Sequence, residues 1–195
     1  YSLEAISSSP AVANGYIYFA ANETYVFQLN AENISLENDF PPTGPGYTEC
    51  GKLDQLNTVY TLQNDVNSSG TCFTIAADNV TLDCNNHMIN YSQLEQGNGV
   101  YFSSSQFDEI TVKNCIVELG NPSVSETYAL YLRSTNNSTI VNNTIYTAGS
   151  SAHGIYLSQN VLLTNIILNN VNVSGSTARG ILVQLSSENN TIVNN

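Results

Sequence analysis

The residues of this chain that could carry out acid–base chemistry are few and widely separated. Hydrolysis of a glycosidic bond needs two carboxylates flanking that bond, and elimination needs cation-binding carboxylates beside an arginine or lysine base. Arg133 and Arg179 stand in different segments with no cluster of carboxylates opposite, and Asp78 and Asp108 fall at equivalent points of two segments. Two such aspartates could bind Ca²⁺, but carboxylates on turns are more often simply hydrated. We therefore expect no catalytic site, no metal site and no cofactor.

Three tyrosines recur in phase and could contact carbohydrate. Tyr101, Tyr131 and Tyr156 each lie between apolar neighbours in the segments GVYF, ALYL and GIYL. A strand places successive residues on opposite faces, so either these rings or their apolar neighbours face outward. An outward row of rings is what a sugar-binding module should display, although stacked tyrosines can also serve only to stabilise a repeat structure. Both interpretations stay open.

Four cysteines predict disulfide bonds. An even number is typical of a small extracellular framework, and four cysteines allow three connectivities. Cys50 and Cys72 flank the entry to a repeat, whereas Cys84 and Cys115 fall one repeat apart. We expect the pairs Cys50–Cys72 and Cys84–Cys115; the alternative for the second pair is two buried thiols that pack as small apolar side chains. A zinc site is not supported, because the chain has no CxxC spacing and only two histidines.

A sequence repeat positions all of these groups. The segments NVTLDCN, EITVKNC, NSTIVNN, TNIILNN and NNTIVNN share one alternating, β-branched pattern at intervals of 30, 28, 27 and 25 residues. A second segment keeps step with it, centred on Val100, Leu130, Ile155 and Ile181. Such self-similarity indicates a unit that stacks on copies of itself, and the alternation predicts strands. Residues from about 58 to 195 should therefore form an all-β, parallel β-helix of about five coils. Its inward ladder is predicted to contain Leu82, Val112, Ile140, Ile167 and Ile192.

Two further columns follow from this alignment. One holds Asn114, Asn142, Asn169 and Asn194, with Cys84 in the first coil. Stacked asparagines can hydrogen-bond to one another and tolerate the left-handed backbone of turns. The other column faces outward and holds Asp83, Lys113, Val141, Leu168 and Val193. Its first two members predict an ion pair and its last three an apolar contact stripe.

The segments NSTIVNNTI, SSENNTIVNN and GIYL resemble the right-handed parallel β-helix repeats of secreted and cell-surface proteins of archaea and bacteria. The stretch from Cys50 to Ile89 resembles the opening coil of such proteins, so the resemblance covers residues 50–195. It implies a right-handed, single-stranded β-helix of the secreted, N-glycosylated type. The family includes polysaccharide-active enzymes, adhesins and structural proteins, so function must be argued from sites. SAHGI around His153 is similar to the Gly-His-Gly of pectin hydrolases, but the accompanying paired aspartates and Arg-x-Lys element are absent.

Residues 1–46 precede the repeat and are predicted to form a separate arm. GYIYF (15–19) and TYVFQL (24–29) predict a β-hairpin, and PPTGPG (41–46) predicts a break that no strand continues through. We therefore predict two domains, the arm with its linker at 1–46 and the β-helix at 47–195. Because a lone hairpin is marginal in water, the arm should either cap its own solenoid or pair with another subunit. The assembly interface is assigned to Tyr16, Tyr18, Tyr25, Phe27, Val141, Leu168 and Val193.

Composition places the chain outside the cell. Only 10% of residues are charged and the net charge is −12, which excludes nucleic-acid binding, and no apolar run is long enough to span a bilayer. The start of the chain carries no signal sequence, so we expect any secretion signal to have been removed. Sequons for N-linked glycans occur at Asn22, Asn33, Asn67, Asn79, Asn90, Asn136, Asn137, Asn142, Asn172 and Asn189. Among the sequons we expect glycans above all on Asn22, Asn33, Asn67 and Asn90, which lie outside the inward ladder. We doubt Asn142, because the alignment puts it in that ladder.

These observations favour a non-enzymatic, extracellular or cell-surface structural glycoprotein that assembles with copies of itself into a filament or surface layer. The repeat runs to Asn195 without a cap, which would leave backbone groups for a partner to pair with. The alternative is a glycan-binding or adhesive β-helix module of a longer surface protein. A polysaccharide lyase or hydrolase is the third interpretation.

Overall fold

The computed structural model describes residues 11–13, 16–21, 25–30, 43–102 and 106–195. These residues divide into two compact units, one within residues 1–41 and one within 42–195. No helix in the described part of the chain is long and apolar enough to cross a membrane.

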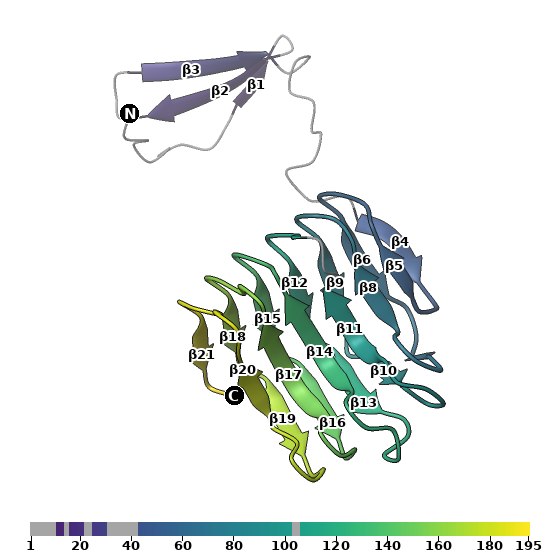
Figure 1. Cartoon of the computed structure of the whole chain (residues 1–195). Coiled ribbons are helices and arrows are strands. Elements are labelled where there is room, and N and C mark those ends of the chain that lie inside the picture. Colours follow the sequence, from purple (N-terminus) through teal and green to yellow (C-terminus); the bar gives the residue numbers. More distant parts are fainter. Residues whose placement is uncertain (1–10, 14–15, 22–24, 31–42, 103–105) are drawn as a thin grey trace. The chain divides into compact units, whose positions relative to one another are not determined.

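The first unit is a three-stranded antiparallel sheet in the order β1-β2-β3 (Figure 1). Its strands are β1 (Ala11–Ala13), β2 (Tyr16–Ala21) and β3 (Tyr25–Asn30). The predicted hairpin corresponds to β2 and β3, and the sequence analysis missed β1. Tyr18 pairs with Gln28 and Phe27 with Phe19, so the aromatic residues assigned to an assembly interface are not cross-strand partners of one another.

The second unit is a parallel β-helix whose strands form three sheets (Figure 1). The seven-stranded sheet contains β4 (Thr43–Tyr47), β6 (Val59–Leu62), β9 (Thr81–Asp83), β12 (Thr111–Lys113), β15 (Thr139–Val141), β18 (Asn165–Ile167) and β21 (Thr191–Val193). The five-stranded sheet contains β7 (Val66–Asn67), β10 (Met88–Tyr91), β13 (Ile116–Leu119), β16 (Thr144–Thr147) and β19 (Asn170–Val173). The six-stranded sheet contains β5 (Gly51–Leu53), β8 (Phe73–Ile75), β11 (Asn98–Phe102), β14 (Tyr128–Arg133), β17 (His153–Ser158) and β20 (Ile181–Val183).

Five complete coils run from β6 to β20, which confirms the predicted solenoid. The solenoid nevertheless begins earlier than predicted. Strand β4 lies partly inside the PPTGPG segment and pairs in parallel with β6, so the prediction that no strand could continue there was wrong. The pairing is irregular between Thr43 and Gly46, and β4 is the edge strand of its sheet, where a proline costs no central hydrogen bond.

The inward ladder of the seven-stranded sheet is confirmed except at one residue. Val112 pairs with both Leu82 and Ile140, and all three are fully buried. In the next coil Ile140 pairs with Ile166, which is buried, whereas the predicted Ile167 pairs with Val141 and is only half-buried. The predicted alignment is therefore shifted by one residue at this coil.

The same one-residue shift changes which residues belong to the predicted asparagine column and to the predicted outward column. Leu168, not Asn169, follows Asn114 and Asn142 at the left-handed turn position, with φ of 58°. The apolar outward column is Val141, Ile167 and Val193. Lys113 Nζ lies 3.3 Å from Asp83 Oδ2, as the predicted ion pair requires.

A second, inward asparagine column was not predicted. It contains Asn143, Asn169 and Asn195. The Nδ2 of Asn143 donates to the Oδ1 of Asn169 (2.9 Å), and the Nδ2 of Asn169 donates to the Oδ1 of Asn195 (2.8 Å). Asn143 and Asn169 are buried, so these contacts satisfy side chains that would otherwise be costly to bury.

Both predicted disulfides are present. Cys50 bonds to Cys72 and Cys84 to Cys115, each with Cα atoms 4.7 Å apart. This separation matches the spacing of neighbouring strands, so each bond joins adjacent coils without distorting them. The backbone N–H of Cys115 donates to Asn143 Oδ1 (3.0 Å), so the second disulfide continues the inward asparagine column toward the first coils.

The shifted ladder yields a matched pair of variants. Ile166→Ala should lower the free energy of unfolding by about 2–5 kcal/mol, because it opens a cavity between Ile140 and Ile192. Ile167→Ala removes a half-buried outward side chain and should cost less than about 1.5 kcal/mol. Urea unfolding followed by circular dichroism measures both. The reverse order of the two effects would show that the register is the one predicted from the sequence.

The disulfides are testable chemically. Denatured, unreduced protein should show no reactive thiol, and reduction should release four, because no described cysteine is free. Replacing Cys84 and Cys115 together by alanine should destabilise the solenoid by about 2–4 kcal/mol. Thiol titration and thermal melts measure these results; two free thiols before reduction would contradict the pairing.

Candidate functional site

Three strands of the six-stranded sheet, β11, β14 and β17, carry two successive inward residues, which brings extra side chains to its outer face. In β14, Ala129 and Leu130 are both buried, while Tyr128 before them and Tyr131 after them are partly exposed. The same pattern places Asn98 and Tyr101 on the outer face of β11. Two outward columns therefore run side by side across this sheet rather than one.

Small residues make this conformation possible. A Cβ atom on Gly99 would lie 2.5 Å from the carbonyl oxygen of Ala129, and one on Gly154 would lie 2.5 Å from that of Gly180. Such distances are far below ordinary contacts, so a larger residue would force neighbouring coils apart. The glycine or alanine that precedes the apolar centre of each GVYF-like segment is the sequence signal for this arrangement. Strict alternation alone does not place Tyr128 or His153 on this face.

Five rings gather on this outer face and form what we call the aromatic cluster: Tyr101, Tyr128, Tyr131, His153 and Tyr156. The rings of Tyr131 and Tyr156 stack in parallel with centroids 5.1 Å apart, and Tyr101 lies 5.4 Å from Tyr131. Tyr128 stacks on His153 at 5.5 Å and meets Tyr131 edge-on at 5.0 Å. The outward position of the three predicted tyrosines is thereby established, and Tyr128 and His153 extend them into a two-column cluster.

A hollow of about 350 Å³ adjoins the cluster, and we call it the aromatic hollow. Its lining residues are Thr71, Gln96, Gly97, Asn98, Glu126, Tyr128 and Tyr131. Two hydrogen bonds hold its walls: Gln96 Nε2 donates to the carbonyl oxygen of Glu126 (2.8 Å), and the backbone N–H of Asn98 donates to Thr71 Oγ1 (3.1 Å). Within the described residues, the side-chain amide of Asn98 and the carboxylate of Glu126 make no hydrogen bond. The hollow thus combines two aromatic walls with free polar groups.

Burial favours the neutral form of three rings at this site. Partial burial, with the neighbouring Tyr156, raises the pKa of Tyr128, and partial burial likewise raises the pKa of Tyr131. Burial, followed by the charge of Arg179, lowers the pKa of His153. The backbone N–H of Arg179 donates to His153 Nδ1 (3.1 Å), which leaves the proton of the neutral ring on Nε2. Burial thus favours neutral Tyr128, Tyr131 and His153 over a charged acid or base, and the hydroxyl of Tyr156 already donates to Gln184 Oε1 (3.0 Å).

The other residues weighed for chemistry do not join this site. Asp78 Oδ1 accepts the backbone N–H of Asp108 (2.9 Å), and Asp108 Oδ1 accepts that of Asn136 (2.8 Å), so these carboxylates cap turns of successive coils. No group of three or more potential metal ligands occurs in the described part of the chain. Arg133 Nε donates to Gln159 Oε1 (2.6 Å), farther along the six-stranded sheet.

The sequons fall into three sets. Asn22 and Asn33 lie outside the described residues. Turn positions hold Asn79, Asn136, Asn137, Asn142 and Asn189. The doubt about Asn142 was misplaced, because Asn142 is exposed and donates to Asn114 Oδ1 (2.8 Å), while its neighbour Asn143 faces inward. The five-stranded sheet holds Asn67, Asn90 and Asn172.

Comparison with known proteins agrees with the architecture. The family model described as the right-handed β-helix region matches residues 57–195. No curated protein and no solved structure matches the chain. Because the family match covers well over half of the sequence, this chain belongs to the right-handed β-helix family.

Proposed function

We propose that this chain is a non-catalytic, extracellular β-helix module that binds neutral carbohydrate at the aromatic hollow. A β-helix fits a surface or structural module, but the family includes enzymes as well as non-enzymes, so the proposal rests on the site. The observation that carries it is the pair of rings, Tyr128 and Tyr131, which wall a hollow of about 350 Å³ beside free amide and carboxylate groups.

The composition of the hollow matches the two kinds of surface on a sugar. The apolar C–H face of a pyranose ring packs on an aromatic side chain, whose π face carries partial negative charge. Its hydroxyl groups need donors and acceptors, which Asn98, Gln96 and Glu126 supply. The volume lies at the lower end of the roughly 300–1,000 Å³ typical of ligand pockets, as expected for a short oligosaccharide.

Charge favours a neutral ligand over an acidic one. The net charge of the chain is −12, and Glu126 is the carboxylate at the hollow itself. A polyuronate would therefore be repelled on approach and again at the site. The Nδ1 of His153 accepts the backbone N–H of Arg179, so this nitrogen is not free to take a proton from a ligand.

The extracellular setting is supported by the two disulfides, which persist in oxidising compartments. We extend the proposal to N-linked glycans on exposed sequons and to a place among archaeal or bacterial surface proteins. Glycans would keep a chain with so few charged residues soluble.

Self-association is a second proposal, which an apolar surface on the last coils favours. Val141, Ile167 and Val193 stack in register on the outer face of the seven-stranded sheet, and Leu168 beside them is 55% exposed. Contiguous exposed apolar residues favour a contact with another protein surface. A second copy of this chain, with its three-stranded N-terminal unit, is the partner we propose.

Carbohydrate binding can be tested by affinity electrophoresis in gels that contain a neutral β-glucan, a mannan or polygalacturonate. At least one neutral polymer should retard the protein and polygalacturonate should not. Tyr128→Ala and Tyr131→Ala should each weaken that retardation roughly tenfold, the effect of losing about 1.4 kcal/mol of contact energy.

Leu56→Ala is the control for these variants. It removes an apolar side chain that is 60% exposed between β5 and β6, lines neither hollow, and should leave retardation unchanged. Wild-type migration that is unaffected by every polymer would refute the proposal, as would equal losses in all three variants.

Self-association can be tested by sedimentation velocity with Leu168→Asn. Asparagine occupies the equivalent turn position in neighbouring coils and tolerates the φ of 58°, so the variant should fold at least as stably as the wild type. The wild type should form oligomers at micromolar concentration, and the variant should shift them toward monomer. A wild type that stays monomeric throughout would exclude this second function.

A further inference from the structure

One of the two outward columns of the five-stranded sheet is rich in sequon asparagines. Asn67 pairs with Asn90, Asn90 with Glu118, Glu118 with Tyr146, and Tyr146 with Asn172. Neighbours in such a column lie about 4.8 Å apart. Asn172 is therefore the sequon of this sheet whose in-register neighbour is an aromatic ring.

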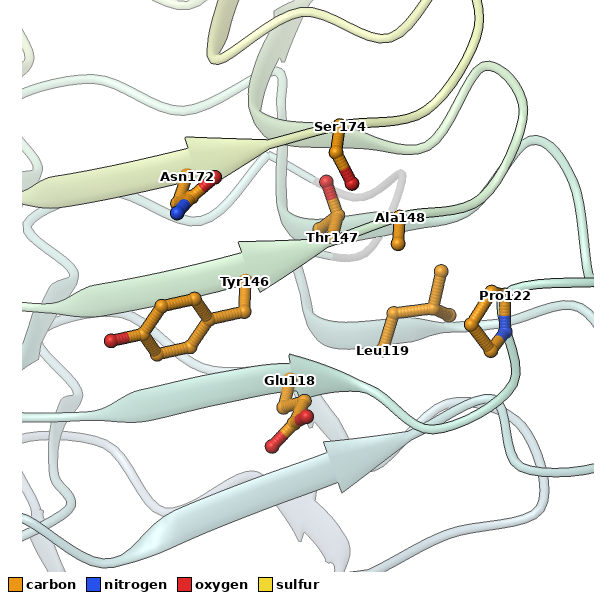
Figure 2. Close-up of a pocket in the computed structure, with 8 residues that line it drawn as sticks. All are labelled: Glu118, Leu119, Pro122, Tyr146, Thr147, Ala148, Asn172 and Ser174. Carbon is orange, nitrogen blue, oxygen red and sulfur yellow. The ribbon is translucent and has the colours of Figure 1, made fainter.

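Tyr146 differs from the tyrosines of the aromatic cluster in its surroundings. Its side chain is 42% exposed, and among the described residues its ring stacks on no other aromatic ring. Figure 2 shows the ring lying along β16 with one face turned toward the viewer, between Glu118 and Asn172. An apolar ring face is thus left open directly beside a sequon.

A second hollow, of about 250 Å³, is lined by Tyr146 together with Glu118 and Asn172. Leu119, Pro122 and Ala148 line its apolar side, and Ser174 contributes a hydroxyl group (Figure 2). The hydroxyl of Thr147, which also lines the hollow, already donates to the carbonyl oxygen of Ala152 (3.0 Å). Ser174 is also the hydroxyl residue of the sequon Asn172-Val173-Ser174. The volume is below the roughly 300 Å³ at which pockets for drug-sized ligands begin, and it suits a single sugar ring.

We propose that Asn172 carries an N-linked glycan whose first sugar is seated in this hollow, with its C–H face on Tyr146. The proposal does not depend on carbohydrate binding at the aromatic hollow. The hollow beside Asn172 distinguishes this sequon from Asn67 and Asn90, which do not line it. The sequence had ranked Asn172 behind four other sequons.

The modification itself requires only a sugar donor of the secretory type. Asn172 Nδ2 loses one proton and forms a bond to the anomeric carbon of a lipid-pyrophosphate-linked oligosaccharide, and the lipid pyrophosphate leaves. Asn172 is exposed on β19, so its amide is free to hold the product in the folded protein.

The contacts available to the first sugar are of three kinds. The ring of Tyr146 offers a face for its C–H groups, Glu118 offers a carboxylate acceptor for its hydroxyls, and Leu119 with Pro122 closes the apolar side. A seated glycan would bridge β13, β16 and β19, three successive coils of the solenoid. Such a bridge stabilises the folded state because it engages neighbouring repeats together.

The test compares two sequon deletions in protein secreted from yeast. Ser174→Ala abolishes the Asn172 sequon and Ser69→Ala abolishes the Asn67 sequon, each without changing the asparagine itself. Glycopeptide mass spectrometry should find Asn172 occupied in the wild type. Ser174→Ala should lower the Tm by about 2–4 °C, and Ser69→Ala should not.

The background variant Tyr146→Ala separates a seated glycan from a merely attached one. In that background, Ser174→Ala should produce no further loss of Tm, because the seat is already gone. Unglycosylated protein from bacteria supplies the baseline, in which Ser174→Ala should have no effect. An unoccupied Asn172, or the same Tm loss with and without Tyr146, would overturn the proposal.

Discussion

The spacing of stacked coils is the constraint on which the rest of this structure depends. Each residue lies one strand separation, about 4.8 Å, from its equivalents in the coils on either side. Each side chain must therefore pack against the side chains at the equivalent position in the neighbouring coils. Inside, Val112 can sit between Leu82 and Ile140 because all three are apolar and similar in volume. The disulfides obey the same rule, since their Cα separation of 4.7 Å is the coil spacing itself.

Polar groups enter the interior only where stacking satisfies them. Asn143 Oδ1 accepts the N–H of Cys115, while its Nδ2 donates to the carbonyl of Val112 and to Asn169 Oδ1. One coil later, Asn169 Oδ1 accepts the backbone N–H of Asn143, and Asn169 Nδ2 donates to the carbonyl oxygen of Ile140. Each side-chain amide thus hydrogen-bonds both to neighbouring backbone groups and to the next asparagine of the column. Replacing one member by an apolar residue would leave buried donors and acceptors on both sides unpaired.

The same spacing limits charge on the outside. Like charges at equivalent positions repel at close range, so the outward columns of the sheets contain neutral residues or opposite charges, as in Asp83 and Lys113. The stacked Asp78 and Asp108 lie on turns instead, where each carboxylate accepts a backbone N–H of the next coil. Partial burial would raise the pKa of Asp83, but hydrogen bonds from Asn114 and Asn85 and the charge of Lys113 outweigh it and lower that pKa. Tyrosine and asparagine tolerate stacking without charge, which accounts for their prominence in a chain with only 10% charged residues.

A column is predicted correctly from the sequence where only one residue can occupy each position. It is predicted incorrectly where two neighbouring residues of the same type compete for that position. Alternating β-branched residues located Leu82, Val112 and Ile140, but Ile166 and Ile167 are chemically the same, and only three-dimensional pairing decides between them. The prediction centred this repeat on Ile167, which placed Asn169 in the asparagine column, whereas Leu168 occupies the left-handed turn that asparagine takes elsewhere.

At the candidate site the failure had a different cause. Strict alternation predicts one outward residue in two, so it found Tyr101, Tyr131 and Tyr156. It could not find Tyr128 or His153, because the two successive inward residues of β14 and β17 break that rule. Gly154 indicates this departure from alternation only when it is known that a Cβ atom there would collide with the carbonyl oxygen of Gly180.

The three sheets of the solenoid carry different chemistry on their outer faces, which allows the proposed roles to coexist. Aromatic rings and the larger hollow lie on the six-stranded sheet, the sequon column on the five-stranded sheet, and the apolar column on the seven-stranded sheet. A glycan at Asn172 would therefore project from a different face than the one on which Tyr128 and Tyr131 meet a ligand. Because successive strands of one coil belong to different sheets, a substitution in one outward column leaves the other two columns in place. Outer faces of this fold can thus change function independently while the inward ladder, which all three sheets share, stays under a single packing constraint.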